Sequence, residues 1–301
     1  MTGHLIHIGY PKTGSTLLQL WFARHPQLAY LETGIAGFRN VYDLCRQSAA
    51  PDPNVRCRVT SSEAIATPHV EVGFLLSQRH RERPDEMPEA QAQACTALRD
   101  LFPNAHVLLV TRGFRSIILS GYSQYVREGG QEDFYAFRPA PSGAAEGEKN
   151  VWNYDYLIGL YRAAFGERLI VLPYELLRDD PDAFARELER RLELDHFPIP
   201  RERPNESLSP VELRWYPRLT RLVRRVARGN RLRKAVLSRY VPAIERNRLR
   251  RLIGLLQRLR PAQPVTIDLI SDDVVNFFRG RADSLRGDPV YAPYADDYLF
   301  G

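Results

Sequence analysis

Lysine is almost absent from this chain, which contains 42 lysines and arginines together but only three lysines, Lys12, Lys149 and Lys234. Arginine has taken nearly every other cationic position. A compact ammonium and a planar guanidinium suit different tasks, so a lysine that persists in such a chain indicates a task that arginine does not perform. Lys12 lies within a motif described below, and we expect that task there.

Cysteines, long apolar runs and a leader segment are also scarce or missing. The three cysteines, Cys45, Cys57 and Cys95, are an odd number without the spacing of a metal site, which favours buried thiols in a reducing compartment. No apolar run reaches the roughly 18 residues of a membrane span. Residues 1–4 have neither the basic region nor the apolar stretch of a signal peptide. We therefore expect a cytoplasmic protein.

Positive charge is concentrated in one stretch of the chain. Residues 201–260 contain 18 lysines and arginines against four acids, although the whole chain has a net charge of only +6. Helical spacing of leucines in this stretch indicates solvated, arginine-rich helices. The same charge also suits an anionic acceptor or peripheral contact with a membrane. A non-enzymatic protein that binds nucleic acid or a membrane surface is the corresponding alternative.

A loop near the N-terminus has the composition of an anion-binding site. It reads Gly9-Tyr10-Pro11-Lys12-Thr13-Gly14-Ser15-Thr16, after the apolar run 5–8 and before helical apolar spacing over 17–22. A strand, a loop and the start of a helix are therefore predicted. The backbone N–H groups and the dipole at such a helix N-terminus attract an anion. The hydroxyl groups and Lys12 add donors and a positive charge.

This loop departs from the Walker A pattern of nucleoside triphosphatases. Gly9, Gly14 and Thr16 keep the Walker spacing, but Ser15 occupies the position of the lysine and Lys12 lies inside the loop. A triphosphatase needs that lysine on the β- and γ-phosphates. A P-loop kinase or NTPase therefore remains only the alternative enzyme.

A second segment places an arginine at the end of another predicted strand. Residues 107–112 are apolar and end in Arg112, as in a buried parallel strand, and Ser120 follows eight residues later within a predicted helix. The guanidinium fork of Arg112 can hold two phosphate oxygens at once. Ser120 would lie two turns into that helix.

The order of elements predicts an α/β fold. Strands at 4–9, 55–60 and 106–112 alternate with helices at 15–25 and 88–102, and a helix from 153 precedes a strand at 168–172. This alternation is typical of a parallel sheet between two layers of helices. Residues 1–200 would form this core, and residues 201–301 a mainly helical, basic extension packed on it, within one structural domain.

A third segment completes a resemblance to a known family. Tyr174-Glu175-Leu176-Leu177 ends a strand and loop and is followed by Asp180-Pro181 and a helix to residue 192. With the loop and the Arg112/Ser120 pair, it resembles the bacterial-type sulfotransferases that use 3′-phosphoadenosine 5′-phosphosulfate (PAPS), with their P-loop-like three-layer fold. Their Gly-Leu turn after the last helix is replaced here by Glu193-Leu194.

The resemblance implies a role for each motif. Pro11, Lys12, Thr13, Gly14, Ser15 and Thr16 would hold the 5′-phosphosulfate, Arg112 and Ser120 the 3′-phosphate, and Tyr174 the adenine, without a metal ion. Lys12 would stabilise the charge that develops on the leaving oxygen. The chain would then transfer a sulfuryl group from PAPS to a hydroxyl of a carbohydrate or small metabolite and release 3′,5′-ADP. No nucleic-acid partner is expected.

The catalytic base has two candidates. Glu63 follows the strand 55–60 in a Ser61-Ser62-Glu63 context that resembles the glutamate base of several relatives, and His69 is its rival. Glu63 could instead complement the dipole at a helix start. Residues 127–150, rich in glycine, proline and charge, predict a mobile loop over the acceptor. The sequence leaves the acceptor and the oligomeric state open.

Overall fold

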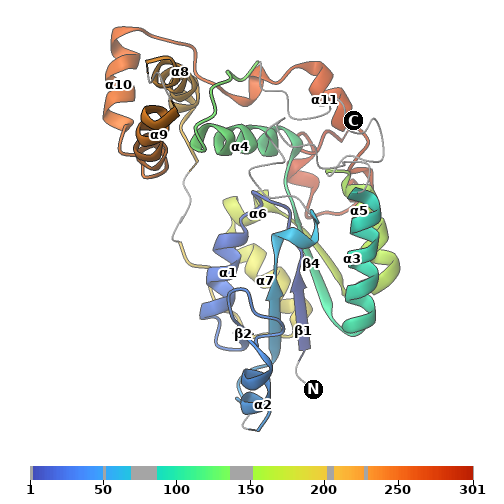
Figure 1. Ribbon diagram of the computed structural model, residues 1–301. Coiled ribbons are helices and arrows are strands. Elements are labelled where there is room, and N and C mark those ends of the chain that lie inside the picture. Colours follow the sequence, from blue (N-terminus) through green and yellow to red (C-terminus); the bar gives the residue numbers. More distant parts are fainter. Residues whose placement is uncertain are drawn as a thin grey trace.

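A parallel β-sheet forms the centre of the protein (Figure 1). The computed structural model describes residues 3–49, 52–68, 87–135, 152–201, 207–226 and 230–300. The five strands within these ranges lie in the order β2-β3-β1-β4-β5, and all neighbouring pairs are parallel. Their bounds are β1 Gly3–His7, β2 Leu28–Tyr30, β3 Cys57–Ser61, β4 His106–Thr111 and β5 Leu169–Pro173.

Helices surround this sheet and make up most of the C-terminal part. The loop 9–14 follows β1, which is the central strand, and leads directly into α1. The helices are α1 Ser15–Arg24, α2 Val41–Ala49, α3 Met87–Leu101, α4 Phe114–Arg127, α5 Tyr154–Phe165, α6 Tyr174–Asp179, α7 Pro181–Leu192, α8 Pro210–Val226, α9 Asn230–Glu245, α10 Arg250–Leu259 and α11 Asp272–Phe278.

The two faces of the sheet carry separate apolar cores, because side chains alternate along each strand. In β4, Val107 and Leu109 join a core with residues of α3, α4 and α5. Leu108 and Val110 join the other core, with residues of α1 and α7. Figure 1 shows α1 and α7 on one side of the sheet and α3 and α5 on the other. The predicted three-layer α/β fold with a parallel sheet is confirmed.

Local details differ from the sequence predictions at two places. The chain after β5 forms the short helix α6 rather than a loop, so Tyr174 is a first helical residue. Glu193 takes the left-handed conformation (φ 55°) at the end of α7, a conformation that glycine adopts most easily. At the other end of α7 Asp180 accepts a hydrogen bond from the N–H of Ala183, and Pro181 begins the helix.

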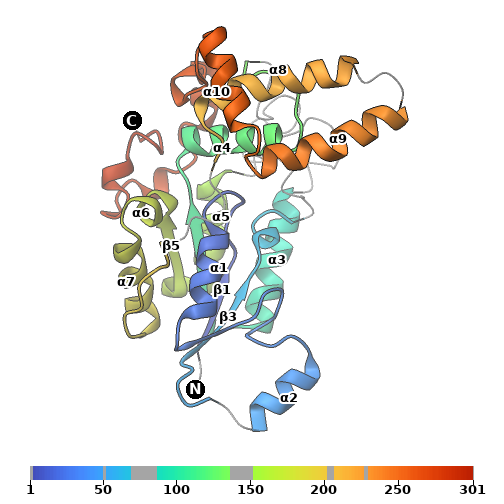
Figure 2. The ribbon, with the colours of Figure 1, turned by 90° about the vertical axis from the view of Figure 1, so that its left-hand side faces the viewer.

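The C-terminal part is helical and contacts the sheet core through α4. α8, α9 and α10 lie beyond α4, and α8 and α9 project to one side (Figures 1 and 2). The Tyr122 hydroxyl in α4 donates to the Leu213 carbonyl in α8, and Phe278, Tyr291 and Tyr298 belong to the same apolar core as β4. The division at residue 200 stays a prediction. No helix in the described ranges is long and apolar enough to cross a membrane.

Candidate functional site

The loop between β1 and α1 turns sharply on two left-handed residues. Lys12 has φ 69° and Gly14 has φ 84°. A Cβ atom at Gly14 would lie 2.8 Å from Leu177 Cδ2 and 3.2 Å from the Tyr174 ring. Since both the backbone conformation and the space exclude a side chain, glycine is required at this position. The loop is therefore held tightly against the start of α6.

The interior of the loop presents donors without partners. The buried Thr13 hydroxyl donates to the Tyr10 carbonyl at 2.6 Å and so shapes the loop itself. The Ser15 hydroxyl is buried but has no hydrogen-bond partner among the described residues, and the same holds for the N–H groups of Gly14 and Ser15. No acidic residue occupies the first turn of α1. This arrangement fits an anion such as a phosphate or sulfonate group.

The remaining loop residues hold or flank this turn. Pro11 is buried, and Thr16 is exposed in the first turn of α1. The partly buried Lys12 extends its ammonium group to α4, where Nζ donates to Gln124 Oε1 at 3.0 Å. Burial lowers the pKa of Lys12, the neighbouring charges of Arg127 and Arg112 lower it further, and Glu63 raises it. Lys12 is thus a cation held near other cations, ready for an anionic ligand.

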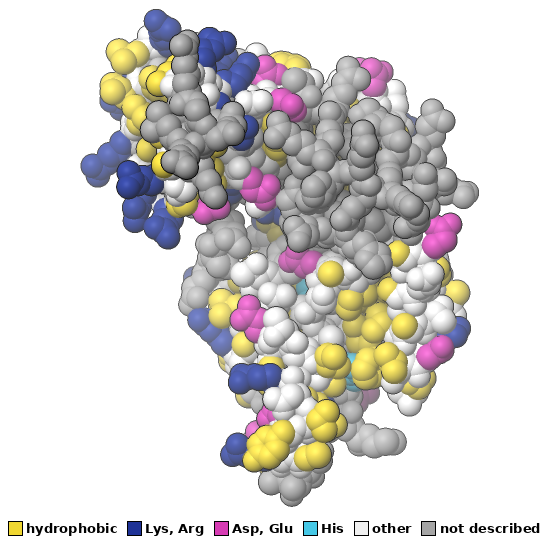
Figure 3. Space-filling view, in the orientation of Figure 1, with side chains coloured by type: hydrophobic (Ala, Val, Ile, Leu, Met, Phe, Trp, Pro, Cys, Tyr) yellow, Lys and Arg dark blue, Asp and Glu magenta, His cyan; other side chains and the backbone are white. Residues whose placement is uncertain are grey.

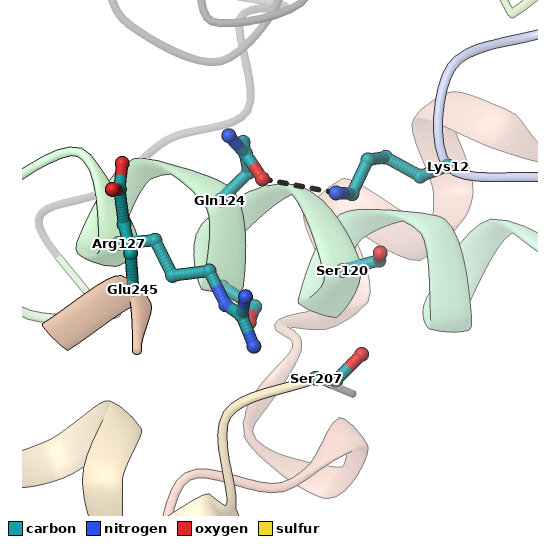
Figure 4. Close-up of a pocket in the computed structure, with 7 residues that line it drawn as sticks. Lys12, Ser120, Gln124, Arg127, Ser207 and Glu245 are labelled. Carbon is teal, nitrogen blue, oxygen red and sulfur yellow. Dashed lines mark hydrogen bonds between the residues drawn. The ribbon is translucent and has the colours of Figure 1, made fainter. Parts of the chain in front are cut away.

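Lys12 and Ser120 line one cavity of about 330 Å³ (Figure 4). Ser120 lies on α4, on the same helix as Gln124, which the Lys12 ammonium contacts. The other lining residues are Ser123, Gln124 and Arg127 of α4, Ser207, and Glu245 at the end of α9. The volume matches small-molecule sites. Of the residues proposed from the sequence, Lys12 and Ser120 therefore share one polar cavity.

Arg112 lies beside the loop rather than on that cavity. Its Nη1 donates to the Lys12 carbonyl at 2.6 Å, and its Nε donates to the Ser116 hydroxyl at 2.9 Å. Its guanidinium group also lies over the Tyr174 ring, 4.4 Å from the centroid. The structure thus brings Arg112, Tyr174 and the loop together, while Ser120 lies on the cavity.

A buried carboxylate that the sequence did not single out fixes the turn after Arg112. Glu175 is fully buried and accepts hydrogen bonds from Gly113 N–H at 3.0 Å, the Ser116 hydroxyl at 3.2 Å and the Tyr298 hydroxyl at 3.1 Å. Asp297 contributes its carbonyl, which accepts from Phe114 N–H at 2.9 Å. The residues that hold Arg112 in place therefore come from α4, α6 and the C-terminal tail.

Glu63 begins a short 3-10 helix, Glu63–Ile65, directly after β3. Burial raises the pKa of its carboxyl group, and the nearby Ser15 hydroxyl and Lys12 charge lower it in part. Ser15 nevertheless makes no hydrogen bond of standard length with a described residue. The structure thus brings Glu63 close to the loop. The rival base, His69, lies outside the described residues.

His7, the last residue of β1, lies underneath the loop. Its ring is fully buried, Nδ1 lies 2.8 Å from the Ser61 hydroxyl oxygen, and Nε2 has no partner in the described structure. A Cβ atom at Gly9 would lie 2.5 Å from Nε2 and 3.3 Å from Ser15 Oγ. Burial lowers the pKa of His7 to about 4, so the ring is neutral at neutral pH.

The described residues contain no group of three or more histidines, cysteines or acids that could hold a metal ion.

A family model described as the sulfotransferase family matches residues 5–198, and the chain belongs to that family. Two solved structures are similar to this chain. One is a sulfotransferase from Alicyclobacillus acidocaldarius, with 16% identity, a TM-score of 0.41, and coverage of 79% of this chain and 96% of that one. The other is mouse sulfotransferase SULT7A1 complexed with PAP, with 11% identity, a TM-score of 0.36, and coverage of 99% and 88%. No curated protein matches this chain.

Proposed function

We propose that the protein transfers a sulfuryl group from PAPS to a hydroxyl of a carbohydrate or small metabolite and releases 3′,5′-ADP. One observation carries this proposal: Lys12 and Ser120 line one cavity beside a loop whose buried Ser15 hydroxyl has no hydrogen-bond partner among the described residues. Membership of the sulfotransferase family supports it. The Walker alternative is weakened because Ser15, not a lysine, stands at the position of the Walker lysine.

The residues present fit the two ends of PAPS. The N–H groups of Gly14 and Ser15 and the Ser15 hydroxyl suit the 5′-phosphosulfate oxygens. Arg112 has engaged Nε and Nη1, and its remaining N–H groups are without a partner in the described structure, so they suit the 3′-phosphate with Ser120. Tyr174 lies against Arg112 and Gly14, where a ring can contact adenine.

Each residue then has a defined part in the reaction. PAPS supplies an activated sulfuryl group and a leaving phosphate oxygen that gains negative charge. Lys12 stabilises that charge, and the N–H groups of the loop fix the anion in place. Glu63 accepts the proton of the acceptor hydroxyl, and the raised pKa of its carboxyl makes it a stronger base than an ordinary glutamate. No step requires a metal ion.

The cavity also limits the acceptor. Its lining beyond Lys12 and Ser120 is polar, with serine hydroxyls, the Gln124 amide, Arg127 and Glu245. Such groups suit an acceptor with several hydroxyls, because each hydroxyl can both donate and accept. Carbohydrates and polar metabolites are therefore the substrates to screen first, with labelled PAPS as donor. Cytoplasmic location and independence of metals remain part of this proposal.

Calorimetry with 3′,5′-ADP and with ADP tests the proposal directly. The two ligands differ in the position of one phosphate, so tighter binding of 3′,5′-ADP, by about tenfold or more, requires a 3′-phosphate site. Transfer from PAPS in the presence of a chelator is the expected second result. Equal affinity for the two nucleotides, or hydrolysis of ATP that depends on Mg²⁺, would support the kinase alternative.

A further inference from the structure

The helices α8 and α10 carry apolar side chains that the fold leaves exposed. On α10, Leu252, Leu255 and Leu259 are exposed by 44%, 53% and 69%. Their spacing of three and four residues places them in one row along the helix. The adjacent side of α10 faces the core, since Ile253 is buried and Leu256 packs on the core. The three exposed leucines, the leucine row, are therefore not needed to pack α10 on the core.

α8 repeats this pattern near its C-terminal end. Leu222 and Val226 are four residues apart, share one side of the helix, and are exposed by 55% and 70%. Further back, Trp215 is buried and its indole N–H donates to Gln257 of α10 at 2.8 Å. The two helices therefore pack together at Trp215 and Gln257, and both apolar rows stay exposed.

Arginines border both apolar rows. Arg251 and Arg258 are exposed, lie seven residues apart, and so share the side of α10 next to the leucine row. Arg218 and Arg225 have the same spacing beside Leu222 on α8. Residues 207–226 and 235–260 contain twelve arginines against two glutamates, Glu212 and Glu245. Glu212 is buried and pairs with Arg250 at 3.2 Å, so this pair carries no net charge and eleven of the arginines remain to set the surface charge.

Figure 3 shows this combination on one face, where hydrophobic and basic side chains are interleaved over the α8–α10 lobe. We propose that α8 and α10 form a docking surface for an anionic lipid bilayer. Exposed leucines would enter the interface between headgroups and acyl chains, and the bordering arginines would contact the lipid phosphates. This inference does not depend on the proposed enzymatic function.

Other partners fit this surface less well. Nucleic acid would pair with the arginines but would leave the leucine row in water. A second copy that used the same surface would bring two sets of arginines together, which is unfavourable. A bilayer with acidic lipids satisfies both chemistries at once. Since Glu245 of α9 lines the candidate cavity and α9 packs on α8 through Tyr240 and Thr220, docking would take place close to the site.

Co-sedimentation of the full chain with lipid vesicles tests the proposal. We expect binding to vesicles of equal parts phosphatidylglycerol and phosphatidylcholine, and no binding to pure phosphatidylcholine. Leu255→Glu with Leu259→Glu should lower the vesicle affinity by about tenfold or more, because the apolar contacts are lost and negative charge is added. Arg251→Glu with Arg258→Glu should have an effect of similar size and make the remaining binding less sensitive to salt.

Matched controls exist on the opposite side of the molecule. Leu101 at the end of α3 is exposed by 69%, as Leu259 is, so Leu101→Glu changes an equally exposed leucine outside the lobe. Arg99→Glu with Arg162→Glu makes the same change of charge on α3 and α5. Neither control should alter vesicle binding. All of these side chains are exposed, so thermal unfolding should be near that of the parent protein.

Three results would overturn the proposal. The first is a protein that binds neither vesicle. The second is vesicle binding that the leucine variants leave unchanged while duplex DNA binds with equal affinity, since contact would then be electrostatic alone. The third is a dimer, seen by light scattering, that Leu255→Glu and Leu259→Glu dissociate, because the leucine row would then be covered by a second copy.

Discussion

Arg112 donates a hydrogen bond of 2.6 Å to the main-chain carbonyl of Lys12, although the two residues are 100 positions apart. The bond joins the end of β4 to the loop after β1, which are neighbouring strands of the sheet. The residue assigned to the 3′-phosphate therefore also supports the residue assigned to the 5′ end. Substitution of Arg112 will act on both, and the experiments below are chosen to separate the two effects.

Lys12→Ala should reduce transfer by about 10² to 10³, because a preorganised charged donor is lost at the leaving oxygen. Folding should be nearly unaffected, since the ammonium group contacts only Gln124 and no apolar core. Rate measurements at saturating donor, with thermal unfolding as the control, distinguish a loss of catalysis from a loss of folding. Gln124→Ala, which removes the partner of Nζ but keeps the charge, should have a much smaller effect. Turnover near that of the parent in Lys12→Ala would remove Lys12 from the mechanism.

Ser120→Ala should weaken binding of 3′,5′-ADP while leaving ADP affinity unchanged, because Ser120 lies on the cavity and is proposed to contact only the 3′-phosphate. Arg112→Ala should weaken 3′,5′-ADP more strongly and should also weaken ADP, since the support of the Lys12 carbonyl is lost. Calorimetry on both variants and both nucleotides measures this pattern. An Arg112→Ala variant with the parental preference for 3′,5′-ADP would contradict its role at the 3′-phosphate.

Glu63→Gln should remove the acidic limb of the pH profile of kcat. The pKa of this carboxyl lies above its usual value, so activity should rise with pH as the carboxylate forms and then reach a plateau. The lowered pKa of Lys12 predicts a loss of activity on the alkaline side at a pH below that of an ordinary lysine. If Glu63→Gln keeps the acidic limb and most of the rate, another group is the base.

Glu175→Ala should lower the free energy of unfolding by about 3 kcal/mol, because Gly113 N–H and two hydroxyls would lose a buried, charged acceptor. Tyr298→Phe removes one of these three bonds and should cost about 1 kcal/mol. Urea denaturation measures both values. Equal stability of Glu175→Ala and the parent would show that the turn after β4 is held by packing alone.

Stability should fall between pH 6.5 and pH 4. The pKa of His7 is 6.5 in the unfolded chain and about 4 when buried, so the unfolded state binds the extra proton in this range. The stabilisation is complete above pH 6.5, and the loss from this residue amounts to about 3 kcal/mol once the pH reaches 4. His7→Gln should show a shallower pH dependence in denaturant titrations. An unchanged slope in this variant would mean that other groups control the acid limb.

The sheet and the loop could be predicted because their signals are local. Apolar runs, the two glycines of the loop and the basic residue at the end of β4 all lie within short windows of sequence. β2 was not predicted, since a strand of three residues has no periodicity to detect. α6 was missed because six residues after a proline are consistent with a loop as well as a helix.

The missed parts of the site depend on contacts between distant residues. Glu175 and Tyr298 are 123 positions apart, and Lys12 and Gln124 are 112 apart. Neither composition nor spacing predicts that such residues contact each other, because each partner alone resembles an ordinary core or surface residue. The Tyr174-Glu175 pair after β5 was visible in the sequence. Only the fold shows that the Glu175 carboxyl accepts a hydrogen bond from Gly113 N–H.

The contacts that Asp297 and Tyr298 make with the turn after β4 can form only late in synthesis of the chain. Asp297 holds Phe114 N–H, and Tyr298 holds both Thr111 and Glu175, so the turn that carries Arg112 is complete only after residue 298 has left the ribosome. A nascent chain can assemble its sheet earlier, yet the turn after β4 would lack these hydrogen bonds until translation has passed this point.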